Sequence, residues 1–86
     1  MKAIEALLAG RTAIESIAGK PPEHTSRCAA TENGWELQFE VLESRGRLTD
    51  NDILATYLLK LDGDGELSAY ERTRRYTRAG NAQLTA

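Results

Sequence analysis

Two runs of strand-forming residues flank the turn sequence Asp62-Gly63-Asp64-Gly65, within a stretch that extends from Asp52 to Arg78. Aspartate and glycine are typical of tight turns, because glycine takes a positive φ without strain and aspartate hydrogen-bonds to the nearby backbone. We predict a type I turn followed by a left-handed Gly65, which makes a three-residue loop with a bulge. This turn commits the chain to an antiparallel sheet.

The loop length also decides which side chains share a face of the sheet. A three-residue loop places Leu61 opposite Leu67, and it keeps Leu67 and Ala69 on the face that a helix covers. The opposite face, here called the outer face, then carries four residues of the last strand: Tyr70, Arg72, Arg74 and Tyr76. A two-residue loop would reverse the faces and put arginines beneath the helix, where an unpaired charge is costly.

A helix is predicted over residues 2–18, because apolar residues recur there at three- and four-residue spacing. These residues are Ile4, Leu7, Leu8, Ile14, Ile17 and Ala18. Gly19 is placed as a left-handed cap, and Pro21 and Pro22 cannot extend the helical hydrogen-bond ladder. The helix should therefore end sharply.

Strands are predicted over residues 26–31, 35–43, 52–62 and 66–78, with a frayed tail over residues 79–86. The second strand has the clearest pattern, since large apolar and polar residues alternate from Trp35 to Val41. The turn Glu32-Asn33-Gly34 precedes it and is expected to use positive backbone angles. The predicted fold class is α+β, with the N-terminal amphipathic helix packed on one face of a three- to four-stranded antiparallel β meander in a single domain, residues 1–86.

The composition of the chain indicates where the protein is located and what kind of partner it has. Apolar runs do not approach the roughly 18 residues of a membrane-spanning helix, and Glu5 and Arg11 interrupt the segment where an export signal would be apolar. We therefore expect a cytoplasmic location. Cys28 is the single cysteine, so an internal disulfide is excluded, and we interpret it as a small packing residue. Acids are concentrated in residues 32–66 and arginines in residues 67–86, which favours oriented docking onto a partner.

Catalytic, cofactor and metal sites are not predicted, and we expect no enzyme activity. His24 is a lone histidine without a surrounding set of catalytic groups. Asp62, Asp64 and Glu66 resemble the start of a calcium loop, but Leu67 stands where that loop needs glycine, so the hairpin turn explains these acids better. The remaining carboxylates with suggestive spacing, Glu36, Glu40 and Glu43, are interpreted as solvated surface residues.

The alternating tyrosines and arginines of the last strand allow three interpretations. Charges along an edge strand discourage edge-to-edge aggregation. The same residues could dock a protein partner, or they could hold single-stranded nucleic acid by stacking and phosphate contacts. The acidic balance of the whole chain, with a net charge of -2, makes nucleic acid the weakest of the three.

Apolar residues on the predicted outer face give a sharper hypothesis. Leu42, Leu54, Leu58 and Tyr70 would merge there into a patch, because neighbouring strands lie about 5 Å apart. A small monomer normally avoids such a patch. We predict a protein-binding surface made of Leu54, Leu58, Tyr70, Arg72, Arg74 and Tyr76.

Several segments resemble one family. They are Gly34-Trp35-Glu36-Leu37, Phe39-Glu40-Val41-Leu42-Glu43, Asp52-Ile53-Leu54-Ala55-Thr56-Tyr57, Leu61-Asp62-Gly63-Asp64-Gly65-Glu66-Leu67, and Tyr70-Glu71-Arg72 through Arg75-Tyr76-Thr77-Arg78. Together they are similar to the body of the gas vesicle protein O family. Two departures are a missing proline near Leu48 and Thr49, and Leu58 where an acidic residue is usual.

The resemblance implies a function that the composition does not. Members of that family are non-enzymatic accessory proteins needed to build gas vesicles, which are cytoplasmic protein shells that provide buoyancy. The implied partners are other gas vesicle structural or accessory proteins, with no membrane and no cofactor. Homodimerisation through the outer sheet face or an edge strand is a further interpretation.

Overall fold

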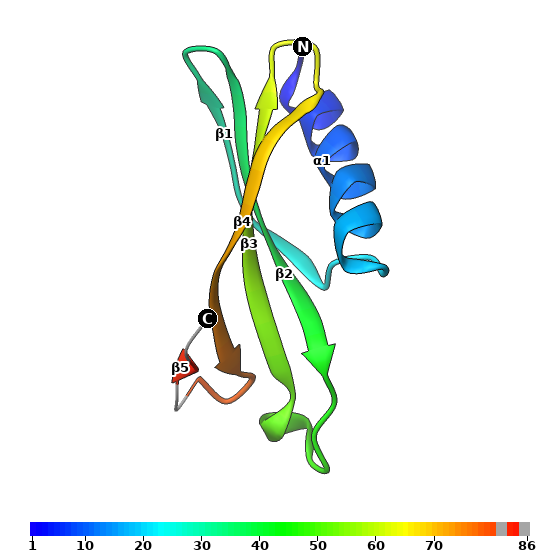
Figure 1. The fold of residues 1–86 in the computed structure, drawn as a ribbon, viewed down its shortest axis with the longest axis vertical. Helices are drawn as coiled ribbons and strands as arrows, with labels where there is room; N and C mark the ends of the chain where they lie inside the picture. The colour runs from blue at the N-terminus through cyan, green and yellow to red at the C-terminus, as the bar shows by residue number, and fades with distance from the viewer. Residues whose placement is uncertain (81–82, 85–86) are drawn as a thin grey trace.

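The computed structural model describes residues 1–80 and 83–84, which form a helix and an antiparallel sheet (Figure 1). In chain order the elements are α1 (Ala3–Ala18), β1 (His24–Thr31), β2 (Gly34–Ser44), the short 3-10 helix η1 (Thr49–Asn51), β3 (Ile53–Asp62), β4 (Leu67–Thr77) and β5 (Gln83–Leu84). The strands pair in the order of the sequence. The predicted α+β class is confirmed.

Helix α1 lies along one face of the sheet and contacts β1, β2 and β3. It ends as expected at Gly19, whose φ is 78° and whose N–H donates to the carbonyl of Glu15 over 2.8 Å. Its buried centre is formed by Ala6, Gly10 and Ile14. The small residues at this centre let the helix approach the sheet closely.

Two residues of the predicted apolar helix face are exposed. Ile4 and Leu8 have 60% and 59% of their surface accessible. The predicted apolar face of the helix is therefore wider than the face that packs against the sheet. The contact runs instead along Ala6, Gly10 and Ile14, with Leu7 and Ile17 packed against the same core.

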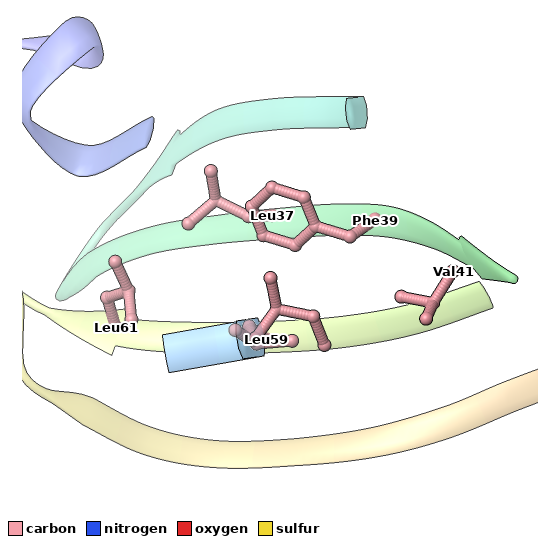
Figure 2. Packing of buried hydrophobic residues seen from close by; sticks show 6 residues of the cluster. Leu37, Phe39, Val41, Leu59 and Leu61 are labelled. Carbon is pink, nitrogen blue, oxygen red and sulfur yellow. The ribbon is translucent and has the colours of Figure 1, made fainter. Parts of the chain in front are cut away.

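The hydrophobic core lies between α1 and the strands β2 and β3. Figure 2 shows Leu37, Phe39 and Val41 of β2 beside Leu59 and Leu61 of β3, and Ile14 of α1 completes this buried cluster. Residues that alternate along β2 and β3 thus point toward the helix, as the period of two predicts.

The turn between β3 and β4 has the predicted form. Gly65 has a φ of 86°, and its N–H donates to the carbonyl of Asp62 over 3.1 Å. The carboxylate of Asp62 accepts from the N–H groups of Asp64 and Glu66. Leu61 pairs with Leu67, as expected.

The position of the first hairpin was predicted correctly, but the predicted conformation of its turn was wrong. β1 and β2 are joined at Glu32 and Asn33, with Thr31 opposite Gly34. Neither Asn33 nor Gly34 has a positive φ, although the turn sequence predicted it. Gly34 is required for another reason, since a Cβ there would clash with the carbonyl oxygen of Leu61.

The register of β4 corrects the predicted faces. Irregularities at Ser68 and Thr73 each shift the pairing with β3 by one residue. As a result, Ala69 pairs with Lys60 on the outer face, whereas Tyr70 and Arg72 pair with Leu59 and Tyr57 on the helix side. After Thr73 the faces switch back, so Arg74 and Tyr76 lie on the outer face as predicted.

The predicted frayed tail contains a short strand. Gln83 and Leu84 form β5, which pairs with Tyr76 and Arg75 of β4. The backbone of the tail thus finds hydrogen-bond partners on the last edge of the sheet. The rest of this prediction, for residues 81–82 and 85–86, lies outside the described residues.

Candidate functional site

A hydrogen-bonded network centred on Glu40 crosses the outer face of the sheet. Ser26 Oγ of β1 donates to Glu40 Oε2 over 2.6 Å. Thr56 Oγ1 of β3 and the hydroxyl of Tyr76 of β4 each donate to Glu40 Oε1, also over 2.6 Å. One carboxylate therefore ties four strands together.

The sequence did not identify Glu40 as special. It was interpreted as a solvated carboxylate, yet only 4% of its surface is exposed. Burial by itself would raise the pKa of Glu40, but the hydrogen bonds from Ser26, Thr56 and Tyr76 outweigh it and hold the pKa below its ordinary value. Alternation marks the face of a residue, but it cannot show that neighbouring strands supply three hydroxyl donors.

Arg74 and Tyr76 form the exposed part of this network. The guanidinium of Arg74 lies 4.4 Å from the centre of the Tyr76 ring, and its Nε donates to Thr56 Oγ1 over 3.2 Å. Burial raises the pKa of Tyr76 to about 12, with its hydrogen bond to Glu40 as the next cause. Arg74 is thus held in place while it remains exposed.

The predicted apolar patch is smaller than expected. Leu54 lies on the outer face, between Leu42 and Tyr76 in the register, but it is only 3% exposed. Leu58 is half-buried and lines a hollow of about 190 Å³. The other lining residues are Lys60, Ala69, Tyr70 and Glu71. Leu58 is therefore the leucine of this strand that remains accessible on the outer face, and neither leucine lies beneath α1.

Tyr70 and Arg72 have surroundings of a different kind. Tyr70 is 54% exposed on the helix side and reaches the edge of the hollow beside Leu58. Arg72 and Arg75 both bind the carboxylate of Glu43, over 2.9 and 2.7 Å. This shared carboxylate compensates the charges that a helix-side register was expected to leave unpaired.

A second polar cluster joins the residues next to β1 with those next to β4. Arg78, just after β4, makes two hydrogen bonds to the carboxylate of Glu23, which precedes β1. It also binds Asp52 Oδ2 over 3.2 Å, and Asp52 Oδ1 accepts from the N–H of Gly46. Since β2 and β3 lie between β1 and β4 in the sheet, this contact links two strands that are not neighbours.

The pKa values in this cluster follow from its contacts. The hydrogen bond from Arg78 is the main cause that lowers the pKa of Glu23, and the backbone N–H of Gly46 is the main cause for Asp52. The hydrogen bond to Glu23 raises the pKa of Arg78. All three groups are therefore charged together at neutral pH.

The remaining sequence candidates make none of the hydrogen bonds of this network. Cys28 is exposed, which corrects its interpretation as a packing residue. His24 is exposed at the start of β1, opposite Glu40 in the register. Among residues 1–80, no group of histidine, cysteine, aspartate or glutamate side chains has the arrangement of a metal site.

A comparison with protein families identifies the chain. The family described as gas vesicle synthesis protein GvpO matches residues 1–82. The chain belongs to the GvpO family. The resemblance noted from the sequence is thereby confirmed.

Two relatives of the GvpO family show how much of the chain is shared. Gas vesicle protein O of Streptomyces sp. (strain CB03234) is 44% identical over 66 residues, which are 76% of this chain and 51% of that protein. Gas vesicle protein O1 of Halobacterium salinarum is 29% identical over 68 residues, which are 79% of this chain and 57% of that protein. The chain thus spans little more than half the length of either relative. No solved structure matches it.

The outer-face network lies largely within the segments that resemble the GvpO family. Glu40, Thr56 and Tyr76 belong to three of these segments, on β2, β3 and β4. Ser26 lies before the first of them. Within the described part of the chain, the helix is too short and too polar to cross a membrane.

Proposed function

We propose that the protein acts in gas vesicle assembly as a non-enzymatic accessory protein that binds other gas vesicle structural or accessory proteins. Its membership of the gas vesicle synthesis family is the observation that carries this proposal. The site of action would be the cytoplasm, on gas vesicles or their assembly intermediates. The binding surface would be the outer face of the sheet.

Arg74 supports this choice of surface. Between Leu67 and Arg78, the other arginines of the described chain pair with carboxylates of the same chain. Arg74 is instead stacked on Tyr76 and hydrogen-bonded to Thr56, and it stays exposed without a carboxylate partner among the described residues. An arginine already held in one conformation loses little entropy on binding and suits a carboxylate of a partner.

Leu58 supplies the apolar part of the proposed surface. It lines the hollow with Lys60 and Ala69, and it lies two residues along β3 from Thr56, the residue that pairs with Arg74. Interfaces commonly combine an apolar centre with arginine and tyrosine anchors. Tyr70 borders the same hollow and Leu54 pairs with Tyr76 on the neighbouring strand, whereas Arg72 binds Glu43 on the helix side.

The register weakens the alternative of a nucleic-acid-binding regulator. That alternative needs a continuous basic and aromatic stripe, but Tyr70 and Arg72 lie on the opposite face from Arg74 and Tyr76. Several of the basic groups are also neutralised by Glu23, Glu43 and Asp52. A stripe divided in this way offers few phosphate contacts on either face.

Co-purification tests the proposal. The tagged protein would be expressed together with the gas vesicle proteins encoded by its own genome, and the co-purified proteins would be quantified. We expect Leu58→Glu and Arg74→Ala each to reduce the captured partner about tenfold or more, as for residues at the centre of an interface.

Arg72→Ala is the matched control, because it removes an arginine of the same strand from the helix side. It should leave capture nearly unchanged. Circular dichroism would establish that all three variants are folded. Undiminished capture by folded Leu58→Glu and Arg74→Ala variants would overturn the proposed surface, and capture of no gas vesicle protein by the parent would overturn the proposed function.

A further inference from the structure

The two long edges of the sheet differ in their protection. The β4 edge has irregularities at Ser68 and Thr73, charged side chains at Glu71 and Arg72, and β5 paired along its last residues. Bulges and charges of this kind prevent another strand from pairing with an edge. The β4 edge is therefore guarded along its length.

The β1 edge has no comparable protection from Arg27 to Thr31. Its pairing with β2 is regular over these five residues, and the one irregularity of β1 comes earlier, between Thr25 and Arg27. Arg27 is the single charged residue of the stretch, and Cys28, Ala29 and Ala30 have small side chains. Within the described chain β1 pairs on one side only, so alternate N–H and C=O groups point away from the sheet.

We propose that the β1 edge from Arg27 to Thr31 pairs with the same edge of a second copy of this chain, antiparallel and centred on Ala29. Ala29 then lies opposite Ala29 of the second copy, Cys28 opposite Ala30, and Arg27 opposite Thr31. The two sheets become one continuous sheet. This interaction goes beyond the proposed function and does not depend on it.

Self-complementarity is the reason for choosing a second copy as the occupant. The stretch has a positive end at Arg27 and is followed by Glu32, so an antiparallel pair brings the Arg27 end of each copy beside the Glu32 end of the other. All five directly opposed pairs consist of small residues or combine one charge with a neutral residue. Like charges do not face each other anywhere in this register.

The size of the contact predicts a weak dimer. Pairing of five residues per copy buries less surface than a standard stable interface, so a dissociation constant of about 10 μM to 1 mM is expected. Sedimentation velocity over a concentration series across this range should show the parent passing from monomer to dimer. A parent that stays monomeric throughout the series would overturn the proposal.

A charge placed at Ala29, where the two copies meet at the same residue, gives a sharper test. Ala29→Lys puts two lysines opposite each other in the dimer, but within the monomer it faces Glu36 of β2 and should not disturb folding. We expect it to weaken the dimer at least about tenfold. Ala29→Glu should do the same, but within the monomer it faces the like charge of Glu36, so circular dichroism must first establish that it is folded. An equimolar mixture of the two folded variants should regain a dimer.

The matched control lies on the opposite edge. Ala69→Glu also places a charge on a small edge residue that faces an opposite charge, Lys60, on the neighbouring strand; Ala69 is exposed, whereas Ala29 is half-buried. It should dimerise like the parent. Dimerisation of Ala29→Lys at parental strength, or a mixture that fails to recover, would overturn the pairing, as would a loss of dimer in Ala69→Glu.

Disulfide formation tests the register itself. Residues directly opposite in an antiparallel pair have Cα atoms about 4.5 to 5.5 Å apart, which suits a disulfide. Ala30→Cys should therefore cross-link to Cys28 of the second copy under mild oxidation. The same substitution combined with Cys28→Ser should give little covalent dimer, and equal cross-linking in both backgrounds would overturn the register.

Discussion

The hydroxyl of Tyr76 on β4 donates a 2.6 Å hydrogen bond to the carboxylate of Glu40 on β2, across the intervening strand β3. This bond links two strands that are not neighbours across the outer face of the sheet. It removes Glu40 from solvent and leaves the Tyr76 ring as a platform for Arg74. The stability of the sheet and the position of the candidate binding residues thus depend on the same contact.

Tyr76→Phe should destabilise the fold. The substitution keeps the ring but removes one of three donors to a buried carboxylate, and hydrogen bonds to charged groups contribute about 1.5 to 3 kcal/mol. The free energy of unfolding, measured in urea, should fall by about that amount. Tyr70→Phe is the control, because Tyr70 is exposed and its hydroxyl makes no side-chain hydrogen bond within the described residues; an equal loss in both variants would contradict the role of the Glu40 contact.

Acid should destabilise the protein through Glu40. The pKa of Glu40 in the folded protein is lower than its ordinary value of 4.5. The stabilisation that its charged carboxylate gives the folded state is therefore complete above pH 4.5 and is lost as the pH falls through the folded pKa. Glu40→Gln lacks this contribution and should be less stable than the parent at pH 7. The difference in unfolding free energy should shrink as the medium becomes acidic, and a difference that stays constant would contradict the prediction.

Alkali should act through Tyr76 with the opposite sign. The pKa of Tyr76 is raised from 10.0 to about 12. The stabilisation that its neutral hydroxyl gives the folded state is therefore complete below pH 10.0 and is lost as the pH rises toward 12. An ultraviolet titration should show a tyrosine ionisation step displaced to high pH, near 12. The late step should be absent from Tyr76→Phe, and its persistence there would assign it to another residue.

Gly10→Val should destabilise the contact between α1 and the sheet. A Cβ at Gly10 would lie 2.9 Å from Leu37 Cδ1 and 3.1 Å from the Phe39 ring, and both side chains are fully buried. Overpacking of this kind costs about 1 to 3 kcal/mol, more than the gain in helix propensity over glycine. Thr12→Val on the exposed side of α1 is the control and should change the unfolding free energy little; a Gly10→Val variant as stable as this control would contradict the packing.

Local patterns were sufficient for the elements and the core. The period of two from Trp35 to Val41 identified the strand face that packs on the helix, and Gly19 and Gly65 marked a helix end and a turn by a need for positive φ. Each of these features depends on residues that are close in the sequence. They could therefore be predicted without knowing which strands are neighbours.

The candidate site was only half predictable. Arg74 and Tyr76 lie on the outer face as the alternation suggested, but the bulges at Ser68 and Thr73 turn Tyr70 and Arg72 to the other side. A bulge depends on how two strands fit together, and its residues have no distinctive local pattern. The faces predicted by alternation from the turn were consequently reversed for the residues between the two bulges.

The order of residues by itself determined a helix, a sheet of successive hairpins and an apolar face shared by β2 and β3, since helix periodicity, strand alternation and turn chemistry are local properties. Only the tertiary structure decided that Glu40 is buried, that Arg72 binds Glu43 and that Arg74 stays exposed. The reason is physical. Whether a charge is solvated, paired or left available depends on groups that the fold brings from distant strands, and curvature and register control those distances.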